Sequence, residues 1–419
     1  MEAQQFRQFK PRLKAYLKQF DDCFGRKDTR AHLPVYVNGQ LSDLERKSVE
    51  PMALKARVKP RTLQEFLSQH QWDEDHMRDR LQQMVAQEHA SPRSIGIIDE
   101  TSFVKKGAKT PGVQRQHCGA VGKQENCIVT VHLGYAADPF HCLLDGELFL
   151  PESWANDRDR CQEAGIPDDM EYRPKTDMAL ELYDRARGNG VRFEWLTFDE
   201  WYGVKPQFLR ALDQREQKFV GEVHKHFVAW IEPPRVTTRP YRRRRVPRLV
   251  AGGPQARHVE DLLRHPALRD QPWQRGRVKD GDKGPQIWEV KHTLIRVKDE
   301  QGLPANKPYH LLVARNVLQP EEIKYFVSNA PEDTRVPILL LVAFSRWRIE
   351  RCFEDQKGEV GLDHYEGRCY PGLKRHLIIT AVSFLFLAKV LEDFRGEKSG
   401  PDRLPGAQGS GGSGALAVA

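Results

Sequence analysis

The sequence lacks the cysteine patterns of a disulfide-rich or zinc-binding protein. Its seven cysteines form no Cys-x-x-Cys pair, their number is odd, and no Cys/His zinc signature accompanies them. Such usage favours reduced thiols in an intracellular protein. The N-terminus also lacks an apolar signal core, and the most apolar run, residues 377–388, is too short to span a bilayer. We therefore expect a soluble, cytoplasmic protein that does not contact a membrane.

Charged residues, in contrast, are abundant and biased toward positive charge. They make up 30% of the 419 residues, and the formal net charge is +8. A chain of this length has room for two or three domains with buried cores. The positive surplus suggests a polyanionic partner, but a surplus of this size does not by itself separate nucleic acid from chance.

The first 90 residues are predicted to be helical. Apolar residues recur at helical spacing from Phe6 to Phe20, and capping-box patterns at Ser42 and Thr62 predict two further helix starts. Basic residues lie between these predicted helices, so the region is either a DNA-binding domain or a helical bundle with surface charge. The sequence leaves both alternatives open.

The rest of the chain alternates between strand and helix patterns. Residues 91–231 and 315–396 predict an α/β domain with a mixed sheet. Residues 232–314 form a predicted β-rich insertion with a basic loop, and residues 397–419 are a flexible low-complexity tail. A predicted buried helix at residues 374–394 closes the α/β domain.

Three carboxylates in distant segments are the candidate catalytic residues. Asp99 ends the predicted strand 94–99, Asp199 ends the predicted strand 193–199, and Glu350 lies on a later predicted helix. Strand ends meet at one edge of an α/β sheet, where ligands usually bind. Three converging carboxylates suit two Mg²⁺ ions about 3.5–4 Å apart, with Mn²⁺ as a substitute, which stabilise in-line displacement at a phosphodiester. Any single acidic residue at a strand end is weak evidence, because such residues commonly cap turns.

The predicted helix that carries Glu350 has two interpretations. Ser345 is a candidate N-cap, and Arg346, Glu350 and Lys357 fall on one stripe of the helix. Such a stripe is either a solvated ladder of ion pairs or a surface that binds metal and phosphate. Taken alone, this segment favours the ladder.

Several sequence blocks resemble bacterial insertion-sequence transposases of the DDE class. Arg346, Glu350 and Lys357 match the Arg-x3-Glu-x6-Lys part of the Tyr-Arg-Glu-Lys signature of that class, and residues 361–365 are similar to the sequence that follows it. The blocks similar to those around the two aspartates are residues 99–107, 112–116, 122–126, 150–167 and 198–203. The blocks follow in order over residues 90–390 and outweigh the ladder interpretation.

The resemblance implies a ribonuclease H-like core, with helices on both faces of its sheet, interrupted by the β-rich insertion. It implies cut-and-paste transposition of double-stranded DNA by a homodimer, with Asp99, Asp199 and Glu350 as ligands of Mg²⁺. Arg346 and Lys357 would then hold phosphates near the cut, the first as a fork and the second as a point charge. The further candidates for DNA contact are Lys105, Lys106, Arg115, Arg242, Arg243, Arg244 and Arg245.

The sequence departs from this class at the tyrosine of the signature. Ala343 occupies that position, so its phosphate contact is missing or comes from elsewhere, conceivably from Tyr365. Trp273 or Trp288 in the insertion is a candidate for stacking on a flipped base, although core packing is the more usual role. Two other functions stay open: a DNA-binding relative that no longer cuts, and a ribonuclease H-like nuclease without strand transfer.

Overall fold

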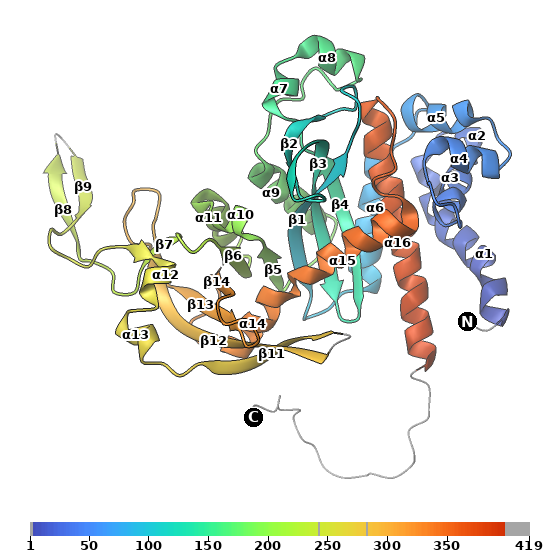
Figure 1. The fold of residues 1–419 in the computed structure, drawn as a ribbon. Helices are drawn as coiled ribbons and strands as arrows, with labels where there is room; N and C mark the ends of the chain where they lie inside the picture. The colour runs from blue at the N-terminus through green and yellow to red at the C-terminus, as the bar shows by residue number, and fades with distance from the viewer. Residues whose placement is uncertain (1–2, 242–243, 282–283, 399–419) are drawn as a thin grey trace, which may run out of the picture. The chain divides into compact units, whose positions relative to one another are not determined.

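The computed structural model describes residues 3–241, 244–281 and 284–398 (Figure 1). These residues form two compact units: Met1–Arg192 with Arg348–Ser399, called unit 1, and Phe193–Trp347, called unit 2. Both contain strands and helices, and parallel as well as antiparallel strand pairing occurs. The predicted α/β class with mixed strand pairing is confirmed. No helix in the described ranges is both long and apolar enough to cross a membrane.

Unit 1 begins with helices, as predicted. Their bounds are α1 Ala3–Leu17, η1 Lys18–Cys23, α2 Lys27–Arg30, α3 His32–Gln40, α4 Val49–Lys55, α5 Pro60–Ser68 and α6 Glu74–Glu88. The two predicted helix starts are wrong. The Ser42 hydroxyl donates to the Gly39 carbonyl (2.7 Å) at the end of α3, and α5 begins at Pro60 rather than at Thr62. Proline suits the first helical position because its φ is preset and its missing N–H would have no partner there.

These helices pack against α16 (Tyr370–Lys398), the long C-terminal helix of Figure 1. The predicted buried helix at 374–394 is confirmed and is longer. The Tyr36 hydroxyl lies 2.8 Å from His376 Nδ1, and Gln40 Nε2 donates to Thr380 Oγ1 (2.8 Å). All four residues are buried. Because buried polar groups need partners, these bonds fix how the N-terminal helices lie on α16.

Four antiparallel strands form the centre of unit 1. Its strands are β1 Ile95–Val104, β2 Gln114–Cys118, β3 Lys123–Ala137 and β4 Phe140–Leu148. The longest strand, β3, pairs with β1 along one side and with β2 and then β4 along the other. The prediction that Asp99 ends a strand is wrong, because β1 continues to Val104. Residues 101–104 extend the ladder, pairing with residues 127–130 of β3.

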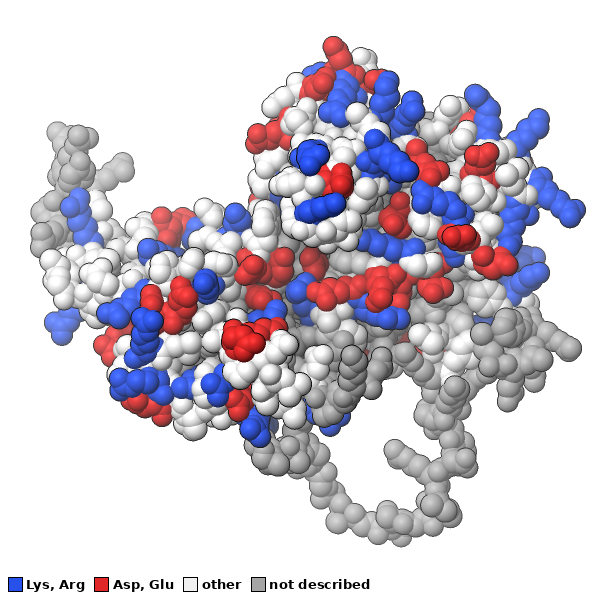
Figure 2. All heavy atoms as spheres, in the orientation of Figure 1, with Lys and Arg blue, Asp and Glu red and all other residues white. Residues whose placement is uncertain are grey.

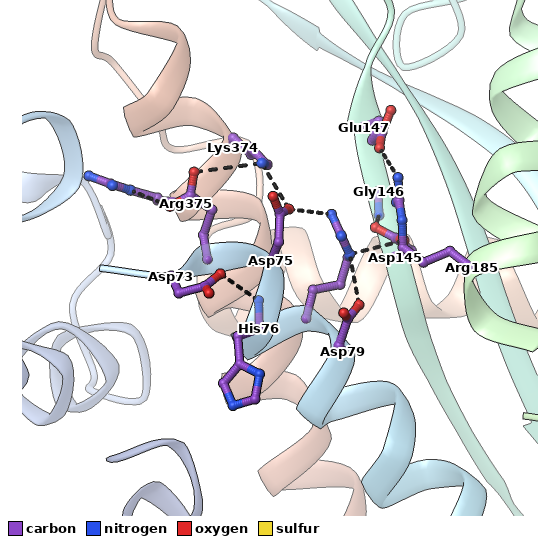
Figure 3. A network of polar contacts seen from close by, with 12 residues as sticks. Asp73, Asp75, His76, Asp79, Asp145, Gly146, Glu147, Arg185, Lys374 and Arg375 are labelled. Atoms are coloured by element: carbon purple, nitrogen blue, oxygen red, sulfur yellow. Dashed lines mark hydrogen bonds and ion pairs between the residues drawn. The ribbon is translucent and has the colours of Figure 1, made fainter. Parts of the chain in front are cut away.

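Shorter helices follow β4, namely α7 Glu152–Ala155, α8 Arg158–Glu163 and α9 Lys175–Gly188. A buried polar network joins α9 to β4 and α6 (Figure 3). Arg185 on α9 donates to Asp145 Oδ2 (2.7 Å) and to Glu147 Oε1 (2.8 Å), both on β4. Arg78 on α6 lies 3.6 Å from Asp145, whose side chain is only 1% exposed. Burial opposes ionisation of Glu147, but the guanidinium groups of Arg185 and Arg173 together outweigh it and lower the pKa of that carboxyl.

Unit 2 contains further strands and short helices. Its bounds are β5 Trp195–Phe198, α10 Glu200–Gly203, α11 Pro206–Gln214, β6 Phe219–Val223, β7 Val228–Trp230, β8 Val236–Tyr241, β9 Arg244–Leu249, β10 Arg257–His258, α12 Val259–Leu262, α13 Pro266–Arg269, β11 Gln274–Gly281, β12 Gly284–Val297, β13 Tyr309–Asn316, β14 Ile323–Ser328, α14 Val336–Ala343 and η2 Phe344–Arg346. β5 and β6 pair in parallel, and antiparallel pairing continues from β6 through β14 and β13 to β12. β8 and β9 form a separate two-stranded sheet.

The predicted basic loop is only partly described. Arg242 and Arg243 lie outside the described residues, whereas Arg244 and Arg245 begin strand β9, so the prediction of a loop is wrong for these two. In the same region Trp288 is 6% exposed and packs against Phe344, with ring centroids 4.6 Å apart. The core interpretation of Trp288 is confirmed.

The segment that carries Arg346, Glu350 and Lys357 is not one continuous α-helix. The 3₁₀ turn η2 precedes α15 (Trp347–Asp355), and the π-helical turn η3 (Gln356–Val360) follows it. The predicted N-cap at Ser345 is wrong, because this hydroxyl is buried and donates to the Val342 carbonyl (2.7 Å). The predicted stripe therefore spans three kinds of helical turn.

Candidate active site

Asp99 lies in the middle of β1, on one face of the unit 1 sheet. It is 7% exposed, and one carboxylate oxygen accepts the backbone N–H of Glu100 (2.8 Å). Successive residues of a strand point to opposite faces, so Glu100 points away from the Asp99 face. There it forms an ion pair with Lys175 at the start of α9 (2.5 Å). These positions favour Asp99 over its neighbour as the metal-binding carboxylate.

Helix α15 covers the face that carries Asp99. In the β1–β3 ladder, Asp99 is paired with His132, and paired residues share a face. The Phe353 ring of α15 packs edge-on against His132, with centroids 5.1 Å apart. Ile349 packs over Gly134, so closely that an added methyl group there would lie 3.3 Å from Ile349 Cδ1.

Glu350 therefore lies on a helix that packs over the Asp99 face. It follows the buried Ile349 on α15, and its own side chain is exposed at the edge of the buried stripe. Lys175 of α9 forms its ion pair with Glu100 on the opposite face, so helices lie on both faces of this sheet, as predicted. The approach of the Glu350 carboxylate to Asp99 stays a prediction.

His132 and Gly146 belong to this face and were missed by sequence reasoning. Burial lowers the pKa of His132 to about 3, so the imidazole is neutral at physiological pH. Its Nε2 lies 2.8 Å from Thr130 Oγ1. Gly146 is its partner in β4, where an added methyl group would lie 2.3 Å from the imidazole. A lone histidine and a lone glycine in apolar strands give no signal that they pack together.

Asp199 lies in unit 2, directly after β5, as the sequence predicts. Its carboxylate caps α10 by accepting the backbone N–H groups of Trp201 (3.0 Å) and Tyr202 (3.3 Å). Parallel pairing of β5 with β6 places the aspartate at the carboxyl end of that strand. Its convergence with Asp99 and Glu350 stays a prediction.

A mostly apolar cavity of about 670 Å³ opens beside α10 in unit 2. Glu200 and Trp201, the two residues after Asp199, both line it, and Trp201 is 36% exposed. The remaining lining residues are Val204, Pro206, Leu209, Arg210, His224, His226, Phe227, Val228, Val297, Lys298 and Tyr309. They come from segments that are far apart in the chain, so no local sequence pattern could have indicated the cavity.

The structure gives Lys105 a role different from the predicted DNA contact. Its ammonium donates to the backbone carbonyls of Tyr365 (2.6 Å) and Asp363 (3.2 Å). Burial lowers its pKa to about 8. Lys105 therefore anchors the segment after η3 to the end of β1. The hydroxyl of Tyr365 also has a partner within the chain. It is buried and donates to the Cys369 carbonyl (2.8 Å), so Tyr365 does not replace the missing signature tyrosine.

Lys357 approaches β1 on the Asp99 face. Its ammonium lies 5.6 Å from the ring centre of Phe103, which points to the same face as Asp99 because the two residues are four apart on one strand. Burial lowers the pKa of Lys357. The side chain is thus partly withdrawn from solvent on the Asp99 face of β1.

Other predicted DNA contacts are exposed. Lys106 lies in the loop after β1, and Arg115 lies on β2. Among the N-terminal helices, exposed cations occur at the end of α4 (Lys55) and in its connection to α5 (Arg57 and Lys59). Figure 2 shows Lys and Arg side chains projecting from these helices, whereas elsewhere on the visible face cations and carboxylates are interspersed.

This sequence matches the family model of the DDE superfamily endonucleases over residues 19–285. The match covers more than half of the chain, which therefore belongs to this family, and the predicted resemblance is confirmed. It includes Asp99 and Asp199. Family membership implies dependence on divalent metal ions.

The chain is also similar to a protein of an insertion sequence. The probable transposase for insertion sequence element IS701 of Microchaete diplosiphon is 29% identical over 199 residues, which are 46% of this chain and 49% of the relative. The chain spans about half the length of the relative that it matches.

Proposed function

We propose that this chain is the DNA transposase of a bacterial insertion sequence. It would cleave double-stranded DNA at the ends of the element and join the released 3′ ends to target DNA, acting as a homodimer on DNA in the cytoplasm. The observation that carries the proposal is that α15, the helix that contains Glu350, packs over the sheet face of Asp99 in a member of the DDE endonuclease family.

The three carboxylates fit the divalent ions that the family requires. All their ligand atoms are oxygens, which Mg²⁺ prefers and Mn²⁺ accepts. We assign Asp99, Asp199 and Glu350 as ligands of two Mg²⁺ ions in a ribonuclease H-like core. A bound pair of such ions supplies Lewis acidity to the attacking and leaving oxygens of a phosphodiester. The approach of Asp199 to the other two carboxylates is part of the proposal.

Other groups of the chain would position the metal ligands and the DNA. Burial and the Glu100 N–H orient the carboxylate of Asp99, and the N-terminus of α10 orients that of Asp199. Lys357 would hold a phosphate as a point charge beside the carboxylates, and Arg346 would hold another as a bidentate fork. Further cations would contact the DNA outside the cut, at Lys106, Arg115, Arg244 and Arg245.

The test uses DNA that carries the inverted repeats flanking the gene. With Mg²⁺, the purified chain is expected to cleave at the repeat ends and to yield products joined to a second DNA. Denaturing gels and sequencing of the junctions measure both steps. Cleaved ends that are never joined would instead indicate a nuclease without strand transfer. Binding with no nick in either Mg²⁺ or Mn²⁺ would indicate a relative that has lost catalysis.

A further inference from the structure

Three side chains of metal-ligand type meet where η1 approaches α6. Asp22 and Cys23 end η1, and His76 lies in the first turn of α6. His76 Nε2 is 3.1 Å from Asp22 Oδ2, and Cys23 Sγ is 3.9 Å from Asp22 Oδ1. One ligand atom from each of the three lies within 4.8 Å of the other two. An ion with about 2.3 Å bonds to sulfur and about 2.0 Å bonds to nitrogen and oxygen needs similar spacings.

The backbone holds these groups together through a single residue. The Asp73 carboxylate accepts the backbone N–H of His76 (2.8 Å), which fixes the first turn of α6. The backbone N–H of Asp73 donates to the Cys23 carbonyl (2.9 Å), which fixes the end of η1 against that turn. Figure 3 shows the His76 imidazole pointing away from the network around Asp145, so that network does not compete for its nitrogen.

An ion-pair cluster is the competing explanation. Arg80, one turn after His76 on α6, also contacts the Asp22 carboxylate. Arg80 and His76 both contact Oδ2 of that carboxylate, and the Cys23 thiol donates to its Oδ1, so the cluster also holds together without an ion. Cys23 is 2% exposed and has its sulfur beside the same carboxylate. The Asp22 and His76 side chains are 51% and 40% exposed, so an ion and a water ligand can enter from solvent.

We propose that Asp22, Cys23 and His76 bind one transition-metal ion of the Zn²⁺ class, separate from the catalytic ions. Thiolate and imidazole ligands select Zn²⁺ or Co²⁺ over Mg²⁺. On binding, the Cys23 S–H bond breaks, its proton passes to solvent, and a metal–sulfur bond forms. The ion displaces Arg80 from Asp22, takes water as its fourth ligand, and ties η1 to α6. This site does not depend on the transposase proposal.

Titration of the full-length protein with Co²⁺, in excess Mg²⁺, tests the site. The expected result is one ion per chain, with the visible bands of tetrahedral Co²⁺ and a near-ultraviolet charge-transfer band from the thiolate. Zn²⁺ should remove both. The catalytic carboxylates contain no sulfur, so the charge-transfer band reports only on a cysteine. Absence of this band in the wild type would overturn the proposal.

Variants identify the ligands. Cys23→Ser should lose the charge-transfer band, and Cys369→Ala, which changes the most accessible of the described cysteines, should keep it. His76→Ala changes an exposed side chain, so the fold should survive, and Co²⁺ affinity should fall at least about tenfold, the loss that even outer-shell changes cause. Arg80→Met should raise the affinity by removing a competitor. A band that persists in Cys23→Ser, or an affinity unchanged in His76→Ala, would overturn the assignment.

Discussion

Replacement of Glu350 by Gln, Asp99 by Asn or Asp199 by Asn is expected to lower the rate of DNA cleavage by about a thousandfold or more. Each change removes one charged ligand from ions that supply several kcal/mol of transition-state stabilisation, and every 1.4 kcal/mol corresponds to a factor of ten in rate. Asparagine is chosen for Asp199 because it caps helices as well as aspartate does, so α10 keeps its N-cap. Single-turnover cleavage of end DNA in Mg²⁺ measures the effect.

The acidic neighbours provide matched controls. Glu100→Gln and Glu200→Gln remove a carboxylate one residue from each aspartate and should keep cleavage near the wild-type rate. Glu100 pairs with Lys175 on the opposite face of the sheet, and Glu200 lines the cavity beside α10. DNA binding should survive in all five variants. Near-wild-type cleavage by Glu350→Gln would refute its assignment as a metal ligand.

Arg185→Met is expected to lower the stability of unit 1 by about 3–5 kcal/mol, the usual effect of removing one partner from a buried ion pair. The variant leaves Asp145, which is 1% exposed, and Glu147 without the guanidinium that binds both. Chemical denaturation of the two proteins at neutral pH measures the difference.

The loss of stability in Arg185→Met should depend on pH. The folded state lowers the pKa of Glu147 below its ordinary 4.5, so the stability due to its ion pair is present above pH 4.5 and is lost as the pH falls through the lowered value. The wild-type advantage should therefore shrink in acid. Arg173→Met is the control: Arg173 also pairs with Glu147 but is 34% exposed, so its loss should cost under about 1 kcal/mol. An Arg185 variant as stable as this control would contradict the account.

Local sequence patterns predicted much of the secondary structure but failed where a contact joins residues that are far apart in the sequence. The buried helix predicted at residues 374–394 is present as α16. The position of Asp99 within its strand could not be predicted in this way. β1 extends beyond Asp99 because it pairs with β3, and the sequence of β1 alone does not reveal that pairing. Ser345 illustrates the same limit: the residue type suits an N-cap, yet its hydroxyl turns back to a carbonyl of the preceding helix.

Charge was the least predictable property of single residues. Lys105 lies in a Lys/Gly-rich turn typical of phosphate contact, but its ammonium is bound to two carbonyls about 260 residues later in the chain. Asp145 looks like an ordinary polar residue of a half-exposed strand. Only the fold shows that α6 and α9 cover it with two arginines. The assignment of Asp99, Asp199 and Glu350 rests on their order in blocks that resemble the transposase family, and it stays a prediction.

The convergence of the three carboxylates on shared metal ions is the central claim, and Fe²⁺-directed cleavage of the polypeptide tests it most directly. Fe²⁺ bound in place of Mg²⁺ generates hydroxyl radicals with ascorbate and peroxide, and these radicals cut the nearby backbone. The account predicts cuts near Asp99, Asp199 and Glu350 together, all suppressed by excess Mg²⁺ and all lost in Glu350→Gln. Cuts near Asp99 and Glu350 that leave the Asp199 segment intact would contradict it.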